Sequence, residues 1–297
     1  MSLVINHNMM AMNAARNLSA SYGNLATSVR RLSSGLRVGQ ASDDAAGLAI
    51  RELMRADIAS LNQGVRNAND AISMIQTADG ALGVIDEKLI RMKELAEQAA
   101  TGTYNSDQRL MIESEYQAMA SEITRIANST DFNGVHLLNG NLSSDVHDGT
   151  GLVSMGKMKI HFGTGNDSAE DYYYIRIGDA TASALGVGNQ ADTTMGGYTV
   201  STQARAQLAV ATINQAIISK DKIRAHLGAM QNRLENTISN LQIQAENMQA
   251  AESRISDVDV ASEMTEFVRN QVLTQAAVAM LSQANSLPQM ALQLIGG

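Results

Sequence analysis

The sequence contains no cysteine and no tryptophan, only one proline, and so few aromatic residues that they make up 3% of its 297 positions. Without cysteine there can be no disulfide, thiolate metal site or thiol nucleophile. The shortage of aromatic residues argues against a compact globular core. It leaves alanine, leucine, isoleucine and methionine to pack the interior, which suits long helices meeting along narrow seams. The single proline, Pro288, leaves the rest of the chain free to form uninterrupted helices.

Motifs of catalysis and nucleotide binding are missing as well. The five histidines are scattered, and the sequence has no HExxH, GxxxxGK[ST], GxGxxG or GxSxG. We therefore expect no enzymatic activity, no metal site and no cofactor. The net charge of −8 argues against a nucleic-acid partner. The first residues lack a basic segment followed by an apolar run, so they do not resemble a cleaved secretory signal.

Charge is absent from the C-terminal stretch 270–297, which contains no Asp, Glu, Lys, Arg or His. A helix on a protein surface normally carries charge on its outer face. Amides at nearly every turn argue against membrane insertion. The stretch therefore predicts a helix enclosed by other protein, the alternative being a solvated and poorly ordered tail. Its stripe of apolar positions includes Val272, Ala276, Met280, Leu287 and Leu294.

The first 40 residues have a matching character. Their only charged residues are Arg16, Arg30, Arg31 and Arg37. The segment from 257 carries a net negative charge, so opposite charge and matching apolar stripes predict that the two ends pair. The alternative is two independent amphipathic helices. Apolar residues of the N-terminal segment recur at alternating steps of four and three, as in a heptad seam. They include Leu18, Tyr22, Leu25, Val29 and Leu32.

Between the two ends, apolar periodicity predicts a long helix over 44–100 with a slip in phase near Gly80, capped by Ser42, Asp43 or Asp44. A shorter antiparallel helix follows a turn at 101–105, with Ser106 as its expected cap. MKIHF at 158–162 and YYYIRI at 172–177 predict a β-hairpin, with the tyrosines packed on the helices, and a second long helix covers 203–255.

The expected fold is mainly α: a long helical rod with coiled-coil-like packing, paired terminal helices and a small β-hairpin region. The expected divisions are an N-terminal arm at 1–40, two core helices at 41–129, a β-rich region at 130–200, a descending helix at 201–256 and a C-terminal arm at 257–297.

Several long segments resemble one protein family. LSSGLRVGQASDDAAGLAI at 32–50 and ITRIANSTDFNG at 123–134 are similar to the N-terminal signature of bacterial flagellins. LGAMQNRLENTISNL at 227–241 and AAESRISDVDVASEMTEFVRNQVL at 250–273 are similar to the C-terminal signature. The chain has no room for the hypervariable outer domains of larger flagellins. The resemblance implies an extracellular subunit of the bacterial flagellar filament, exported unfolded by the flagellar type III apparatus, whose terminal arms polymerise.

The same resemblance implies partners. These are further copies of the chain, an export chaperone, the filament cap, hook-associated proteins and, in a host, Toll-like receptor 5. The family's receptor-contacting residues match Arg91, Leu95 and Glu115 here. These residues could instead serve contacts between subunits.

Three other interpretations remain open. A hook–filament junction protein, or another type III secreted accessory protein, would share the terminal helices but should have a larger internal region. A membrane-active helical translocator conflicts with the amides of the C-terminal stretch. A filament subunit with an enzymatic outer domain would need more than the short 130–200 region.

Overall fold

The computed structural model describes residues 8–149, 156–188 and 197–295, and among these the side chains at 287, 288 and 291–295 lie outside the description. The chain forms two compact units, one comprising residues 1–58 with 246–297 and the other residues 59–245. The boundaries between the units fall inside the two long helices. The expected divisions at 40/41 and 256/257 instead coincide with breaks between helices. The expected rod includes both units and stays a prediction.

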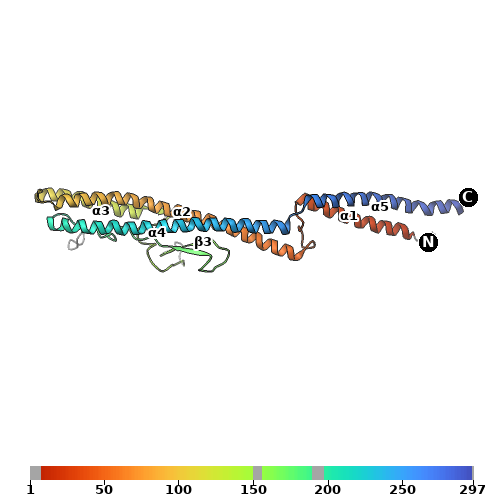
Figure 1. The fold of residues 1–297 in the computed structure, drawn as a ribbon, viewed down its shortest axis with the longest axis horizontal. Helices are drawn as coiled ribbons and strands as arrows, with labels where there is room; N and C mark the ends of the chain where they lie inside the picture. Colours follow the sequence, from red (N-terminus) through yellow and green to blue (C-terminus); the bar gives the residue numbers. More distant parts are fainter. Residues whose placement is uncertain (1–7, 150–155, 189–196, 296–297) are drawn as a thin grey trace. The chain divides into compact units, whose positions relative to one another are not determined.

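Three helices dominate the unit at 59–245, namely the greater part of α2 (Ala45–Ala100), α3 (Ser106–Ser129) and the greater part of α4 (Gln203–Ser256) (Figure 1). The expected mainly α fold is confirmed. α2 continues without interruption past Gly80, where the apolar pattern slips in phase. Its seam residues Leu82, Ile85 and Leu89 are fully buried. On α4, small residues continue the seam towards the helix start, with Ala206, Ala209 and Ala216 buried. The interior is therefore packed by aliphatic and small side chains, as the composition predicts.

The helix starts follow from their caps. The carboxylate of Asp44 accepts the backbone N–H of Gly47 at 2.9 Å, which confirms one of the three expected caps of α2. The expected cap of α3 was wrong by one residue. Asn105 accepts the N–H of Gln108 at 2.8 Å, and the Gln108 side chain accepts the N–H of Asn105 at 3.0 Å. This reciprocal capping box satisfies two backbone donors, which Ser106 could not do from inside the helix.

Two short hairpins lie in the same unit. β3 (Met158–His161) pairs with β4 (Tyr172–Ile175) in antiparallel register, which confirms the expected hairpin. A second hairpin, β1 (Asp131–Phe132) with β2 (Val135–His136), was not foreseen. The sequence signal for this hairpin is the dipeptide Asn133–Gly134. Both residues have positive φ in the structure, of 51° and 80°. A tight hairpin turn requires that conformation, and Asn–Gly adopts it readily.

The β3–β4 hairpin is fastened to both long helices. The amide of Asn67 on α2 donates to the carbonyl of His161 at 2.8 Å. The guanidinium of Arg233 on α4 stacks 3.6 Å from the ring centre of Tyr173, so one of the three consecutive tyrosines packs on a helix as expected. Gly64 allows the closest approach, since a Cβ atom there would lie 2.0 Å from the carbonyl oxygen of Phe162.

Two ion pairs join α2 to α4. Arg224 donates twice to the carboxylate of Asp79, at 2.7 and 3.1 Å, and this hydrogen bonding lowers the pKa of Asp79. Lys220 is only 1% exposed, and its Nζ lies 2.5 Å from the Asp86 carboxylate and 2.8 Å from that of Asp221. A buried cation must be paired, so these contacts tie α2 and α4 to one register.

The other unit contains α1 (Met9–Ser34) and α5 (Val260–Ile295), together with the start of α2 and the end of α4. α1 and α5 lie side by side, with the chain's two ends at the same end of the pair (Figure 1). α1 ends at Gly35, whose φ of 73° lies in the left-handed region that favours glycine. The expected pairing of the two ends is therefore present in the structure.

We expect Gly64→Ala to loosen the hairpin and destabilise the unit by about 1–3 kcal/mol, because its methyl group would overlap backbone rather than a flexible side chain. Gly80→Ala, on the same helix, is the matched control. No atom lies within 4 Å of its Cβ position, so it should stabilise the chain by about 0.5–1 kcal/mol. Thermal unfolding of both variants measures the difference. Equal effects would show that the close approach at Gly64 does not matter.

Candidate assembly surface on the terminal helices

The helices α1 and α5 run antiparallel from the contact of Asn8 with Ala284 to that of Arg31 with Glu263. At one end the side-chain amide of Asn8 donates to the carbonyl of Ala284 at 2.7 Å. Near the other end the guanidinium of Arg31 lies 3.6 Å from the carboxylate of Glu263. Because residues 8 and 31 of one helix meet residues 284 and 263 of the other, the two segments form a single pair of helices.

The seam between them combines small and polar side chains with half-buried larger ones. Ser28 on α1 and Asn270, Thr274 and Ala284 on α5 are the residues buried here, and Thr274 donates its hydroxyl to the carbonyl of Asn270 at 2.7 Å. The half-buried apolar residues on the same faces are Leu18, Leu25 and Leu32 of α1 and Phe267 and Leu281 of α5. Only part of each expected apolar stripe therefore joins the two ends. Small side chains let the two backbones approach closely, and the hydroxyl satisfies its own hydrogen bond within its helix.

The large apolar side chains lie mostly outside this seam. Among the expected polymerisation residues, Val272 and Met280 are 57% and 63% exposed, and Ala276, Tyr22 and Val29 are exposed too. Leu18, Leu25 and Leu32 are half-buried, whereas the side chains of Leu287 and Leu294 lie outside the described residues. Further exposed apolar residues on α5 were not singled out from the sequence. They are Val260, Met264, Val268, Leu273, Val278 and Met290.

These residues fall on two flanks of α5. At 100° per residue, Val268 and Val272 lie on the face opposite the buried residues Asn270 and Thr274, about 140–180° around the helix from their mean direction. Leu273 and Met280 lie about 80–100° from that direction, on the side of the groove. We call these the valine flank and the groove flank. One helix thus presents apolar surface in two directions, in addition to the side that contacts α1.

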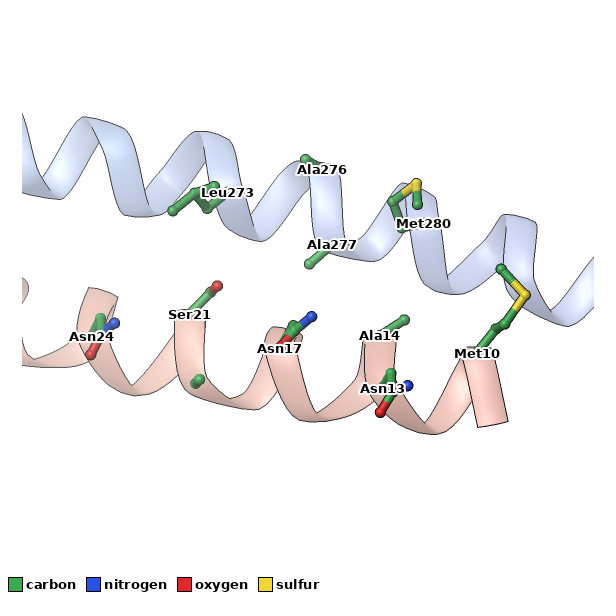
Figure 2. A pocket seen from close by; sticks show the side chains of 11 residues that line it. Met10, Asn13, Ala14, Asn17, Ser21, Asn24, Leu273, Ala276, Ala277 and Met280 are labelled. Atoms are coloured by element: carbon green, nitrogen blue, oxygen red, sulfur yellow. The ribbon is translucent and has the colours of Figure 1, made fainter. Parts of the chain in front are cut away.

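The groove flank borders an open groove of about 650 Å³ between α1 and α5. Figure 2 shows Ala14 and Ser21 of α1 pointing towards α5, and Ala277 of α5 pointing back towards α1. Met10 and Met280 lie at one end of the groove, on opposite helices. No charged side chain lines it, since the remaining lining residues are alanines, asparagines and Leu273. A groove with small walls and no charge can accept a side chain from another helix.

The junction that begins both arms is held by backbone and arginine contacts. The N–H of Arg37 donates to the carbonyl of Ser256 at 2.7 Å, and the N–H of Val258 donates to that of Gly35 at 3.0 Å. The guanidinium of Arg37 donates to the carbonyl of Ile255 at 2.7 Å. Of the four arginines in the N-terminal segment, only Arg31 therefore meets a carboxylate of α5. Opposite charge contributes less to this pairing than the sequence predicts.

Two carboxylates of the junction are stabilised in their ionised form. Asp259 caps α5, and hydrogen bonds from the Ser262 hydroxyl and from the N–H groups of Ser262 and Ala261 lower its pKa. Burial opposes ionisation of Asp43, yet the N–H groups of Gln40 and Gly39 and the guanidinium of Arg30 hold its pKa below the ordinary value. The sequence alone did not reveal the partners of either aspartate, because these contacts depend on the path of the segments that connect the helices.

No described helix is long and apolar enough to cross a membrane. Among the residues that the structure describes, no three His, Asp or Glu side chains gather as a metal ion would require. The described surface of the unit formed by residues 1–58 and 246–297 is therefore distinguished by its apolar flanks and groove rather than by a cluster of reactive side chains.

Comparison with known proteins agrees with this geometry. The family model of the bacterial flagellin N-terminal helical region matches residues 5–143, and that of the bacterial flagellin C-terminal helical region matches residues 210–295. The flagellar filament 33 kDa core protein of Treponema phagedenis is 41% identical over 293 residues, which cover 99% of this chain and 100% of that protein. The chain belongs to the bacterial flagellin family.

Two further flagellins are similar to this chain in sequence. The flagellin of Bacillus subtilis is 41% identical over 315 residues, covering 98% of this chain and 99% of that protein. The crystal structure of Bacillus cereus flagellin is 30% identical, with a TM-score of 0.46, and the match covers 63% of this chain and 94% of that one. Because the curated relatives match end to end, this flagellin has the short form without large outer domains.

The structure separates the three residues that the family resemblance assigned to a receptor. Arg91 donates to the carboxylate of Glu115 at 2.8 and 2.9 Å, and both side chains are well exposed. Leu95 is only 1% exposed and belongs to the core between the helices. A direct receptor contact by Leu95 therefore conflicts with the structure, since a seam position on α2 points it inward.

We expect acid to weaken the junction through Asp259. A lowered folded-state pKa means that the stabilisation is fully present above the ordinary value of 3.8 and is lost as the pH falls through the folded-state pKa. Asp259→Asn keeps an N-cap but cannot ionise, so its thermal stability should depend less on pH in this range than that of the wild type. Asp259→Ala should lose about 1 kcal/mol even at neutral pH. Parallel pH profiles for wild type and Asp259→Asn would contradict the assignment.

Proposed function

We propose that this flagellin is a structural subunit that polymerises into the extracellular bacterial flagellar filament used for motility, with the terminal helices as its assembly surface. The observation that carries the proposal is the exposure of large apolar side chains on α1 and α5 outside the seam that joins the two helices. Exposed apolar patches of this extent mark interaction sites. The uncharged stretch 270–297 suits a helix surrounded by neighbouring copies.

The same proposal includes the route and the remaining partners. The subunit is exported unfolded by the flagellar type III apparatus, a route that membership of the flagellin family supports. Its further binding partners are an export chaperone, the filament cap and hook-associated proteins. Its role is structural and not catalytic. The named relatives, which match over nearly their full length, are flagellins or filament core proteins, and they favour this role over that of a junction protein.

We expect Val272→Glu to abolish or strongly weaken polymerisation while leaving the single chain folded. Val272 is exposed in the isolated chain, so a carboxylate there stays solvated until assembly encloses it. Losing the burial of one such side chain costs about 1.5–3 kcal/mol, and enclosing an unpaired charge adds to this. The critical concentration for seeded polymerisation should rise at least about tenfold.

Gln98→Glu is the matched control. Gln98 is exposed on α2, and its amide donates to the hydroxyl of Tyr104 at 3.0 Å. A glutamate there can accept that hydroxyl instead, so the added charge stays solvated and paired. Sedimentation and circular dichroism of both variants test the proposal. If Val272→Glu polymerises at the wild-type concentration, the valine flank is not part of the assembly surface.

We further propose that the exposed Arg91–Glu115 pair contributes to binding by Toll-like receptor 5. The supporting observation is that both side chains lie on the surface of α2 and α3, with Arg91 also 2.9 Å from Glu94. A planar guanidinium held between the carboxylates of Glu115 and Glu94 is a typical interface anchor.

Arg91→Ala with Glu115→Ala should then weaken receptor activation by more than about tenfold without unfolding the chain, since truncating an interface arginine often costs more than 1 kcal/mol. Leu95→Ala is the contrasting variant. It should lower the free energy of unfolding by about 2–5 kcal/mol through a core cavity, and any receptor defect should follow that instability. Full activation by the folded double variant would count against the surface pair.

A further inference from the structure

Methionine is distributed unevenly over this flagellin. Among the methionines whose side chains the structure describes, seven are exposed, and six of these lie on α1 or α5 with exposed fractions between 44% and 63%. In the described part of the unit at 59–245, by contrast, Met74 and Met92 are almost fully buried, and only Met111 is exposed. The six exposed arm methionines are Met9, Met10, Met12, Met264, Met280 and Met290.

Their positions coincide with the proposed assembly surface. Met10 and Met280 face the same groove from opposite helices (Figure 2). Met264 lies four residues from Val268 on the valine flank. The flexible thioether side chain adapts to irregular partner surfaces, which explains its use here. It also places oxidisable sulfur where neighbouring copies would pack.

The composition makes these sulfurs unusually important for oxidant chemistry. The chain has 17 methionines but no cysteine and no tryptophan, so thioethers are its main targets for two-electron oxidants. Reaction with hydrogen peroxide breaks the O–O bond and transfers one oxygen atom to sulfur. The sulfur loses two electrons and forms an S=O bond, and the peroxide is reduced to water. The product is polar and disrupts methionine-rich interfaces.

We propose that the six exposed arm methionines form an oxidant-sensitive switch that blocks polymerisation of the free subunit and is reversed by methionine sulfoxide reductases. This inference rests on the proposed assembly function and names a modification that regulates the same surface. Sulfoxide oxygens on the flanks and in the groove retain water that assembly must remove. The buried sulfurs of the other unit do not react on the same timescale, so the chain stays folded. Copies already in a filament are protected, because assembly covers the six sulfurs.

The experiment compares peroxide-treated and untreated full-length protein in seeded polymerisation, with oxidation mapped by peptide mass spectrometry. The six sulfurs should react at least about tenfold faster than Met74 and Met92 in free subunits, and much more slowly in filaments. Treated wild type should lose polymerisation, and reductases specific for both sulfoxide epimers should restore it.

Two variants assign the effect to the arms. A chain with all six changed to leucine should show the same polymerisation with and without peroxide, whatever its own untreated level. Met111→Leu should remain as sensitive to peroxide as the wild type, because its sulfur lies on α3. If the sixfold variant does not polymerise at all, reductase recovery of the treated wild type still decides the matter.

The outcomes are distinguishable from failure of the proposed function. An untreated wild-type chain that never polymerises would refute the assembly role itself. A wild type that polymerises normally after full oxidation of the arm sulfurs would overturn the switch alone. Loss of polymerisation that reductases cannot reverse, or that persists in the sixfold variant, would also overturn it.

Discussion

The two terminal helices carry more large apolar surface than they can bury against each other. Their shared seam buries serine, asparagine, threonine and alanine and half-buries leucines and a phenylalanine, while valines and methionines remain outside. Placing the outer aliphatic side chains in the seam would give a more stable isolated pair, since burial of an aliphatic side chain contributes roughly 1.5–3 kcal/mol. Under the proposed function, that stabilisation comes from contacts with other copies. Folding of the arms is then coupled energetically to assembly, because the favourable term appears only when a partner is present.

The unit at 59–245 instead buries most of its large apolar side chains within its own chain. Its seam buries leucine, isoleucine and methionine on α2, with alanines on α4, and it closes on itself without another chain. Apolar packing alone does not fix the register of α2 against α4, because repeated small apolar positions allow the helices to slide. The buried Lys220 fixes the register, since a shift by one turn would separate its ammonium from Asp86 and leave the buried charge with Asp221 of its own helix as partner. Asp79 and Arg224 repeat the constraint nearer to the surface.

Sequence periodicity predicted the elements but not their contacts. The long helices at 45–100 and 203–256 and the β3–β4 hairpin were predicted within a few residues, because apolar spacing and the missing prolines leave few alternatives. The β1–β2 hairpin was missed although Asn133–Gly134 signals it, since its strands are only two residues long. The pairing of the arms was foreseen, but only part of the expected stripe lies in the seam, since Leu18, Leu25 and Leu32 are half-buried there whereas Tyr22 and Val29 are exposed. A heptad pattern shows which residues share a face, and it cannot show whether that face meets its own chain or another copy.

The same limit explains Leu95. Leu95 follows Arg91 by about one turn of α2, yet the leucine is buried in the core between the helices and the arginine lies outside, where Glu115 of α3 reaches it. Spacing along α2 alone does not show which of its sides the neighbouring helices cover.

On α5, no third helix of the same unit covers either flank among the described residues. A single two-fold contact would bury one flank in a closed dimer and leave the other in water. Apolar residues on α5 point in two directions, opposite the seam with α1 and towards the groove, so covering both flanks takes neighbours on more than one side. Contacts between unlike surfaces of identical chains do not close at two copies, and they generate an open helical array when the rotation does not close a ring. The side-chain arrangement of one subunit thus already favours a filament over a dimer.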